Sequence, residues 1–162
     1  MNLSRLADLE LLLRDMYEAL SELAMVLENE HHALETTDVD KLHQAAVRKE
    51  GLSDKLEKLE QQRVALLSRA NKTPDKESML LFIDEAAGNR SESMHSIWQM
   101  VEELAVRCDT QNRINGIVIE NSKRQTQAAL AILRGHLTAE DKLYGADGGT
   151  VSQVQNSSLA RA

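Results

Sequence analysis

The chain of 162 residues is long enough for one domain with a modest core, and its composition is that of an acidic globular protein. Because 42% of the residues are hydrophobic but only 2% aromatic, a core must be built from leucine, alanine, valine, isoleucine and methionine, which favours helical layers. The net charge of −7 argues against nucleic acid as a partner, since an acidic chain is repelled by phosphate backbones.

The start of the sequence and its one cysteine indicate a protein of the cytoplasm. The first residues, Met-Asn-Leu-Ser-Arg-Leu-Ala-Asp, lack the basic flank and the apolar run of a signal peptide. No stretch approaches the roughly 20 apolar residues that cross a bilayer. Cys108 cannot form an internal disulfide, and its apolar position favours a buried structural thiol. We therefore expect a cytoplasmic protein without membrane insertion.

The first predicted helix covers about residues 3–36. Leucine and methionine recur there at spacings of three and four, which is typical of a coiled-coil-like seam on one helix face. The seam consists of Leu6, Leu9, Leu13, Met16, Leu20, Leu23, Leu27 and Leu34. Glu30 is the one charged residue in it.

The second predicted helix covers about residues 38–70, with Thr37 or Asp38 as its cap. Lys49 and Arg63 interrupt its leucine seam. We expect their aliphatic stems to lie along the seam while their charges reach solvent. Because the connection to the first helix is short, the two helices should form an antiparallel hairpin.

The third predicted helix covers about residues 74–87. Thr73 is expected to cap it and Pro74 to be its first residue, where the missing N–H of proline costs nothing. Gly88 and Asn89 should end it.

The fourth predicted helix is the longest and covers about residues 91–136. No strong breaker precedes Gly135, although Gly116 weakens the helix by up to about 1 kcal/mol relative to alanine. Its first turns contain Met94 and Trp98, which we expect to lie in the core.

These four segments predict an all-α fold. We expect a single helical domain over residues 1–144, built as a long antiparallel helical hairpin or bundle with coiled-coil-like seams and a long C-terminal helix. After Gly135, Thr138 to Asp141 resemble a capping box that opens one more turn. Residues 145–162 carry few apolar side chains and are expected to form a disordered tail.

The seam of the fourth helix changes from apolar to polar and back. The polar stretch runs from Gln111 to Gln125 and includes Asn115 and Ser122. Two interpretations are open: the middle of the helix packs loosely or is solvated, or another chain completes the seam and pairs with its amides. Addition of a helix to a bundle or groove is the recognition mode that the second interpretation implies.

One pattern suggests metal chemistry. Glu-x-x-His occurs twice, at Glu28 and His31 and at Glu92 and His95, and bundle di-iron proteins use two such motifs with two further glutamates. The motif is short and charged residues are common in this chain, so we expect no metal site. No Ser-His-Asp set, Gly-rich phosphate loop or CxxC motif occurs. The sequence therefore predicts neither an enzyme nor a cofactor.

Two stretches carry a resemblance to a known family. After an Asp-Val-Asp-Lys-Leu turn, the second helix contains Lys49-Glu50 and then Leu56-x-x-Leu59-Glu60-x-x-Arg63-x-x-Leu66-Leu67. The more specific signature is Asn112-x-x-Asn115-Gly116-x-x-Ile119-x-Asn121, then Gln125-x-x-x-Ala129-Leu130-x-x-Leu133 and Leu143-Tyr144-Gly145. Together with the leucine-rich first helix, these stretches resemble the flagellar export chaperones of the FlgN type.

The resemblance implies a function. Such chaperones serve the flagellar type III secretion system in the cytoplasm, bind the C-terminal helices of the hook–filament junction proteins FlgK and FlgL, and deliver them to the export gate protein FlhA. Partner binding is implied on the C-terminal amphipathic helix, at Asn112, Ile114, Asn115, Ile117, Val118, Asn121, Gln125, Ala129, Leu130 and Leu133. Tyr144 looks like the tyrosine that contacts the gate, although an aromatic clamp on a terminal turn is an alternative.

Two other functions stay open. The same heptads would serve a self-associating coiled-coil scaffold without a client, and a homodimer is compatible with either function. A di-iron helical-bundle enzyme is the remote alternative.

Overall fold

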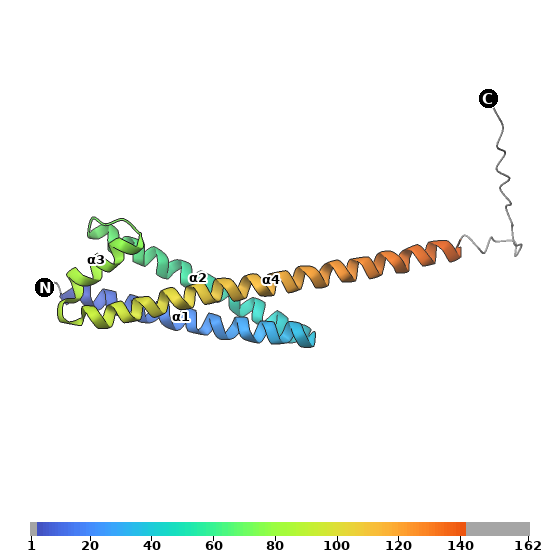
Figure 1. Ribbon diagram of the computed structural model, residues 1–162, viewed down its shortest axis with the longest axis horizontal. Coiled ribbons are helices and arrows are strands. Elements are labelled where there is room, and N and C mark those ends of the chain that lie inside the picture. Colours follow the sequence, from blue (N-terminus) through green and yellow to red (C-terminus); the bar gives the residue numbers. More distant parts are fainter. Residues whose placement is uncertain (1–2, 142–162) are drawn as a thin grey trace, which may run out of the picture. The chain divides into compact units, whose positions relative to one another are not determined.

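Every regular element is a helix in the computed structural model, which describes residues 3–141 and the side chains of residues 5–134. In chain order these are α1 (Leu3–Thr36), α2 (Val39–Arg69), α3 (Lys76–Ala87), the short 3-10 helix η1 (Gly88–Arg90) and α4 (Ser91–Asp141) (Figure 1). The predicted all-α class is confirmed. The chain divides into two compact units, one that ends at Ile119 and one that begins at Glu120.

Local hydrogen bonds fix the turn between α1 and α2. Thr37 adopts a left-handed φ of 55°, and the amides of Thr37 and Asp38 donate to the carbonyls of Leu34 and Ala33. This pairing is a Schellman closure, which satisfies the last carbonyls of a helix. Asp38 then caps α2, because its carboxylate accepts from the Lys41 amide at 3.1 Å. The same hydrogen bond lowers the pKa of Asp38. The chain thus reverses within two residues into the predicted hairpin.

The hydrophobic core is arranged around α1. Its predicted seam is buried apart from Leu23 and Leu34, which are half-buried. Leu12, Ala19 and Ala24 are buried as well, so α1 is enclosed on more than one side. One continuous apolar cluster joins α1 to α2, α3 and the first turns of α4, where Met94 and Trp98 lie in the core as predicted.

The start of α3 differs from the prediction. The helix begins at Lys76, so Pro74 precedes it, and its cap is Asp75 instead of Thr73. The Asp75 carboxylate accepts from the Ser78 amide at 2.7 Å, while the Thr73 hydroxyl donates to the same carboxylate. The Thr73 hydroxyl and then the Ser78 amide hold the pKa of Asp75 below its usual value. Thr73 therefore supports the cap without being the cap.

The end of α4 also differs from the prediction. The helix passes through Gly135 and continues to Asp141, so Thr138 opens no separate turn. A single glycine costs a helix only about 1 kcal/mol, which is not enough to end it in the absence of proline. The single domain over residues 1–144 stays a prediction, and the expected tail at 145–162 lies outside the described residues.

The two cations of the α2 seam turn inward. Arg63 is buried, and its guanidinium donates to Glu60 at 2.7 and 2.8 Å and to the Pro74 carbonyl at 3.0 Å. The hydrogen bonds that Arg63 donates to Glu60 raise the pKa of Arg63. The ammonium of Lys49 binds Glu30 of α1. The expected exposure of the Arg63 charge was wrong, because the guanidinium is buried against Glu60. Lys49 is half-buried, and its side chain stays 25% exposed beside Glu30.

None of the helices in the described part of the chain has the length and apolar character needed to cross a membrane.

The central position of α1 can be tested at Leu13. Leu13→Ala should lower the free energy of unfolding by about 2–5 kcal/mol, because the side chain is fully buried and its loss leaves a cavity. Leu11 lies on the same helix but is 50% exposed, so Leu11→Ala should cost less than about 1 kcal/mol. Urea denaturation followed by circular dichroism measures both. Similar costs for the two variants would contradict a core centred on α1.

Candidate functional site

The polar stretch of α4 contains one fully buried side chain, that of Asn115. This side chain is 0% exposed. Its Nδ2 donates to the Leu27 carbonyl of α1 at 2.9 Å and to the Glu30 carboxylate at 2.9 Å. Both amide protons are thus satisfied by one turn of α1.

The carbonyl oxygen of Asn115 is satisfied as well. Gln111 Nε2 donates to Asn115 Oδ1 at 3.0 Å, and His31 Nδ1 lies 3.0 Å from the same oxygen. Because an amide oxygen can only accept, His31 Nδ1 must carry the proton in this contact. No hydrogen-bonding capacity of Asn115 is left for a partner in this conformation.

Lys49 joins α2 to the same group. Its ammonium lies 2.8 and 3.1 Å from the two oxygens of Glu30, whose side chain is 5% exposed, and 3.2 Å from Asn112 Oδ1. Charge-assisted hydrogen bonds of this kind are needed to keep a carboxylate out of water. We call the six side chains the polar cluster: Glu30, His31, Lys49, Gln111, Asn112 and Asn115.

The polar cluster changes the interpretation of the α4 seam. Neither of the two interpretations of the seam describes Asn115. Its side chain is not solvated, and its hydrogen bonds are completed within this chain and not by another one. A partner could reach it only by displacing α1. Sequence reasoning missed this cluster, although Glu30 and Lys49 each stood out as the exception in an apolar seam.

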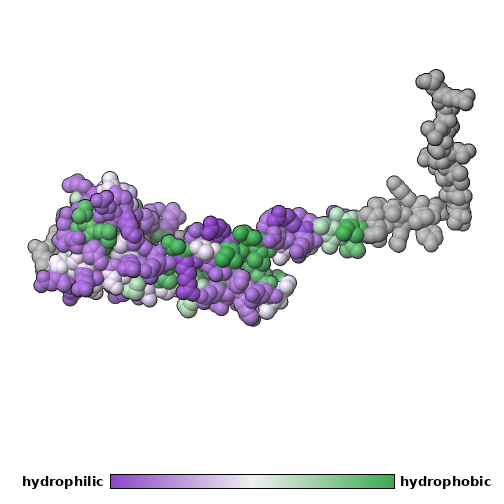
Figure 2. Space-filling view, viewed as in Figure 1, coloured by the Kyte–Doolittle hydropathy of each residue, from purple (hydrophilic) through white to green (hydrophobic). Residues whose placement is uncertain are grey.

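The other residues predicted to bind a partner are accessible. Val118 is half-buried, and the exposed members are Asn112, Ile114, Ile117, Asn121, Gln125, Ala129, Leu130 and Leu133. Large apolar side chains among them are far from covered: Ile117 is 56% exposed, Leu130 45% and Leu133 59%. Ile119 and Ile132 are also exposed. Figure 2 shows hydrophobic surface, coloured green, along the described part of α4. Within the described part of the second unit, residues 120–134, every side chain is exposed.

The two Glu-x-x-His motifs do not meet. Glu28 pairs with Arg107, and His31 belongs to the polar cluster. His95 Nε2 lies 2.8 Å from Asp84, whose pKa is lowered by hydrogen bonds from Ser91 and from this histidine. Among residues 5–134, no three His, Cys, Asp or Glu side chains are placed to hold a metal ion. The ligand set of a di-iron site is therefore not assembled.

Cys108 is buried, as expected for a structural thiol. Its Sγ donates to the Leu20 carbonyl at 3.5 Å. Burial raises the pKa of the thiol.

Comparison with known proteins points to one family. The family model described as FlgN protein matches residues 1–152, which is most of the chain. No curated protein and no solved structure matches.

The polar cluster can be tested through its charges. Lys49→Met should lower the free energy of unfolding by about 2–4 kcal/mol, because Glu30 keeps a buried carboxylate without its cation. Adding Glu30→Gln should bring stability back to within about 1 kcal/mol of the wild type, since a neutral amide still accepts from Asn115.

Urea denaturation measures this pair of variants. Lys55→Met is the matched control, because Lys55 is an exposed lysine of α2 outside the polar cluster. If the double variant were no more stable than Lys49→Met alone, the buried charge of Glu30 would not be the cause.

Proposed function

Because the chain belongs to the FlgN family, whose members are flagellar export chaperones, we propose that it binds the C-terminal helices of the hook–filament junction proteins FlgK and FlgL in the cytoplasm and delivers them to the export gate protein FlhA. We propose that it does so as a binding protein, without catalysis and without a cofactor.

The observation that supports client binding most directly is the exposed apolar surface of α4. Ile114, Ile117, Leu130 and Leu133 are large apolar side chains that are between 42% and 59% exposed. A client helix that covered them would remove this apolar area from water, at roughly 25 cal/mol per Å². The proposed client-binding segment is Asn112–Leu133 without Asn115, whose side chain is fully buried and hydrogen-bonded within the chain.

The polar residues of this segment suit a temporary complex. Asn121 and Gln125 interrupt the apolar residues, so a client helix meets an incomplete apolar stripe. Asn121 already accepts from Arg124 at 2.6 Å, and a client must compete with that hydrogen bond. Such a surface favours moderate affinity and release at the gate.

A self-associating scaffold would use the same surface, since exposed apolar residues of α4 could also pair with a second copy. Light scattering separates the two functions. A scaffold gives one tight oligomer at all concentrations, whereas a chaperone changes its state when a client is added.

The client-binding segment can be tested with a triple variant. Replacing Ile117, Leu130 and Leu133 by serine should weaken binding of FlgK and FlgL C-terminal segments at least about tenfold, because three apolar contacts are lost. Stability should change little, since all three side chains are exposed. Isothermal titration calorimetry measures the affinity.

Met25→Ser is the matched control for these variants, because Met25 is 59% exposed but lies on α1. Unchanged client affinity in the triple variant, or an equal loss in Met25→Ser, would exclude this segment as the site.

Gate docking is proposed for Tyr144, which lies outside the described residues. Tyr144→Ala should weaken binding to FlhA and leave client affinity nearly intact, because the tyrosine stands beyond the client-binding segment. Tyr17→Ala changes the only other tyrosine of the chain, on α1, and should affect neither. Equal loss of client and gate binding in Tyr144→Ala would mean that the tyrosine supports the fold.

A further inference from the structure

A groove runs between α2 and α4, with α1 as its floor. It consists of two hollows of about 460 and 500 Å³ that share Leu20 of α1 and Ala105 of α4. Met16, Leu23 and Leu27 continue the floor. We call it the α2–α4 groove. Its floor is apolar and mostly buried, whereas Ala46 on the α2 wall and Ala105 and Val106 on the α4 wall are exposed.

Two contacts between α2 and α4 mark the ends of the groove. At one end the Arg63 guanidinium lies 5.8 Å from the centre of the Trp98 ring, a cation–π arrangement. At the other end Lys49 Nζ donates to Asn112 Oδ1 at 3.2 Å. From Trp98 to Asn112, α4 rises by about 21 Å, which is about four helical turns. The groove is long enough for a helix and too long for a small ligand.

Trp98 leaves one hydrogen-bond donor unused. The side chain is 7% exposed, and its Nε1 is buried without a partner among the described residues. An unpaired buried N–H costs free energy, so an acceptor that reached it would be bound favourably. The same tryptophan lines a neighbouring hollow of about 690 Å³ between α3 and α4. Trp98 therefore lines this hollow as well as the 460 Å³ hollow of the α2–α4 groove.

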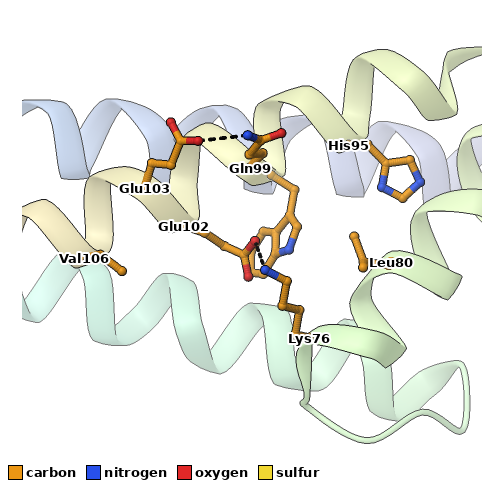
Figure 3. Close-up of a pocket in the computed structure, with 8 residues that line it drawn as sticks. Lys76, Leu80, His95, Gln99, Glu102, Glu103 and Val106 are labelled. Carbon is orange, nitrogen blue, oxygen red and sulfur yellow. Dashed lines mark hydrogen bonds and ion pairs between the residues drawn. The ribbon is translucent and has the colours of Figure 1, made fainter.

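The side chains beside Trp98 can move aside for an acceptor. Lys76 of α3 reaches Glu102 of α4 with a contact of 2.8 Å, and Gln99 donates to Glu103 at 2.9 Å (Figure 3). The Lys76 side chain is 67% exposed. An ion pair so open to water contributes little stability, so a partner can displace it at small cost.

The charges along the groove select the partner. Arg63, Lys76 and Lys49 are each held by a carboxylate of this chain. Two carboxylates that line the groove, Glu50 and Asp109, have no cation partner among the described side chains. The unbalanced charge of the groove is therefore acidic, and it complements a basic partner.

We propose that the α2–α4 groove binds a helix of another protein, one whose apolar stripe is flanked by lysine or arginine and which offers Trp98 an acceptor. A helix satisfies its own backbone groups, which suits a groove walled by helices and offering no strand edge. A second copy of this chain is a poor partner for the groove, because its net charge of −7 would be repelled by the acidic rim. The α2–α4 groove and the client-binding segment have only Asn112 in common, so they are different sites.

Trp98 is the only tryptophan of the chain, so its fluorescence reports on the groove. The probe is a tryptophan-free helical peptide of about 18 residues with leucine at a three–four spacing and lysine and glutamine elsewhere. The control peptide carries glutamate in place of lysine. On the full chain, the lysine peptide should shift the Trp98 emission saturably, and the glutamate peptide should bind at least about tenfold more weakly.

A matched pair of variants locates the binding site. Ala105 is exposed in the middle of the groove, so Ala105→Arg should block it and weaken the lysine peptide at least about tenfold. Ala7→Arg makes the same charge change at an exposed position of α1 outside the groove. This variant should bind the lysine peptide as tightly as the wild type does. Circular dichroism should show that both variants stay folded. Ala105→Arg should also leave the affinity for FlgK and FlgL within about twofold of the wild-type value. The experiment can therefore contradict the groove proposal without contradicting the client proposal, and the reverse.

Four results would overturn the proposal. Equal binding of the lysine and glutamate peptides would contradict the selection of a basic partner by the acidic groove. Full binding to Ala105→Arg, or loss of peptide binding only in the triple serine variant of α4, would place the peptide elsewhere. A Trp98 emission that changed with protein concentration alone would assign the groove to a second copy.

Discussion

The hydrogen bonds of Asn115 are the constraint on which the rest of the first unit depends. A buried amide with four satisfied contacts tolerates only one position of α4 along α1, since a shift by a turn would leave its donors and its acceptor without partners. The Glu30 carboxylate in turn requires the cation of Lys49, which brings in α2. Apolar packing holds the three helices together, and the polar cluster decides which registers are allowed.

This arrangement divides α4 into parts with different tasks. Up to Asn115 its inward face is committed to the protein's own core, through Trp98, Val101 and Cys108. Beyond that point the described side chains are mostly exposed, including apolar residues such as Ile117 and Leu133. The α2–α4 groove lies along the committed part, so the two proposed binding surfaces differ in chemistry: one is an exposed apolar helix, the other an acid-rimmed hollow.

The sequence was sufficient to predict the helices, the hairpin and the buried seam of α1, because periodicity reports which side chains share a face. It was insufficient for the polar cluster, because periodicity does not report which helix a face meets. Glu30, Lys49 and Asn115 were each visible as a polar interruption of a separate apolar seam. Only the packing of three helices shows that these interruptions pair with one another. Trp98 was expected in the core, and its unpaired N–H could not be seen without the surrounding side chains.

The fixed points on α4 also limit how the length of the chain can vary. Trp98 and Asn115 are both held by neighbouring helices, so inserting one residue between them would rotate Asn115 by about 100° and carry it away from Glu30. The connection from Ala70 to Asp75 is different: besides its caps, it contacts the fold through the Pro74 carbonyl and the Lys72–Glu85 ion pair, and a loop of this kind tolerates added residues. Insertions and deletions among relatives should therefore gather in that connection and spare the stretch between the tryptophan and the asparagine.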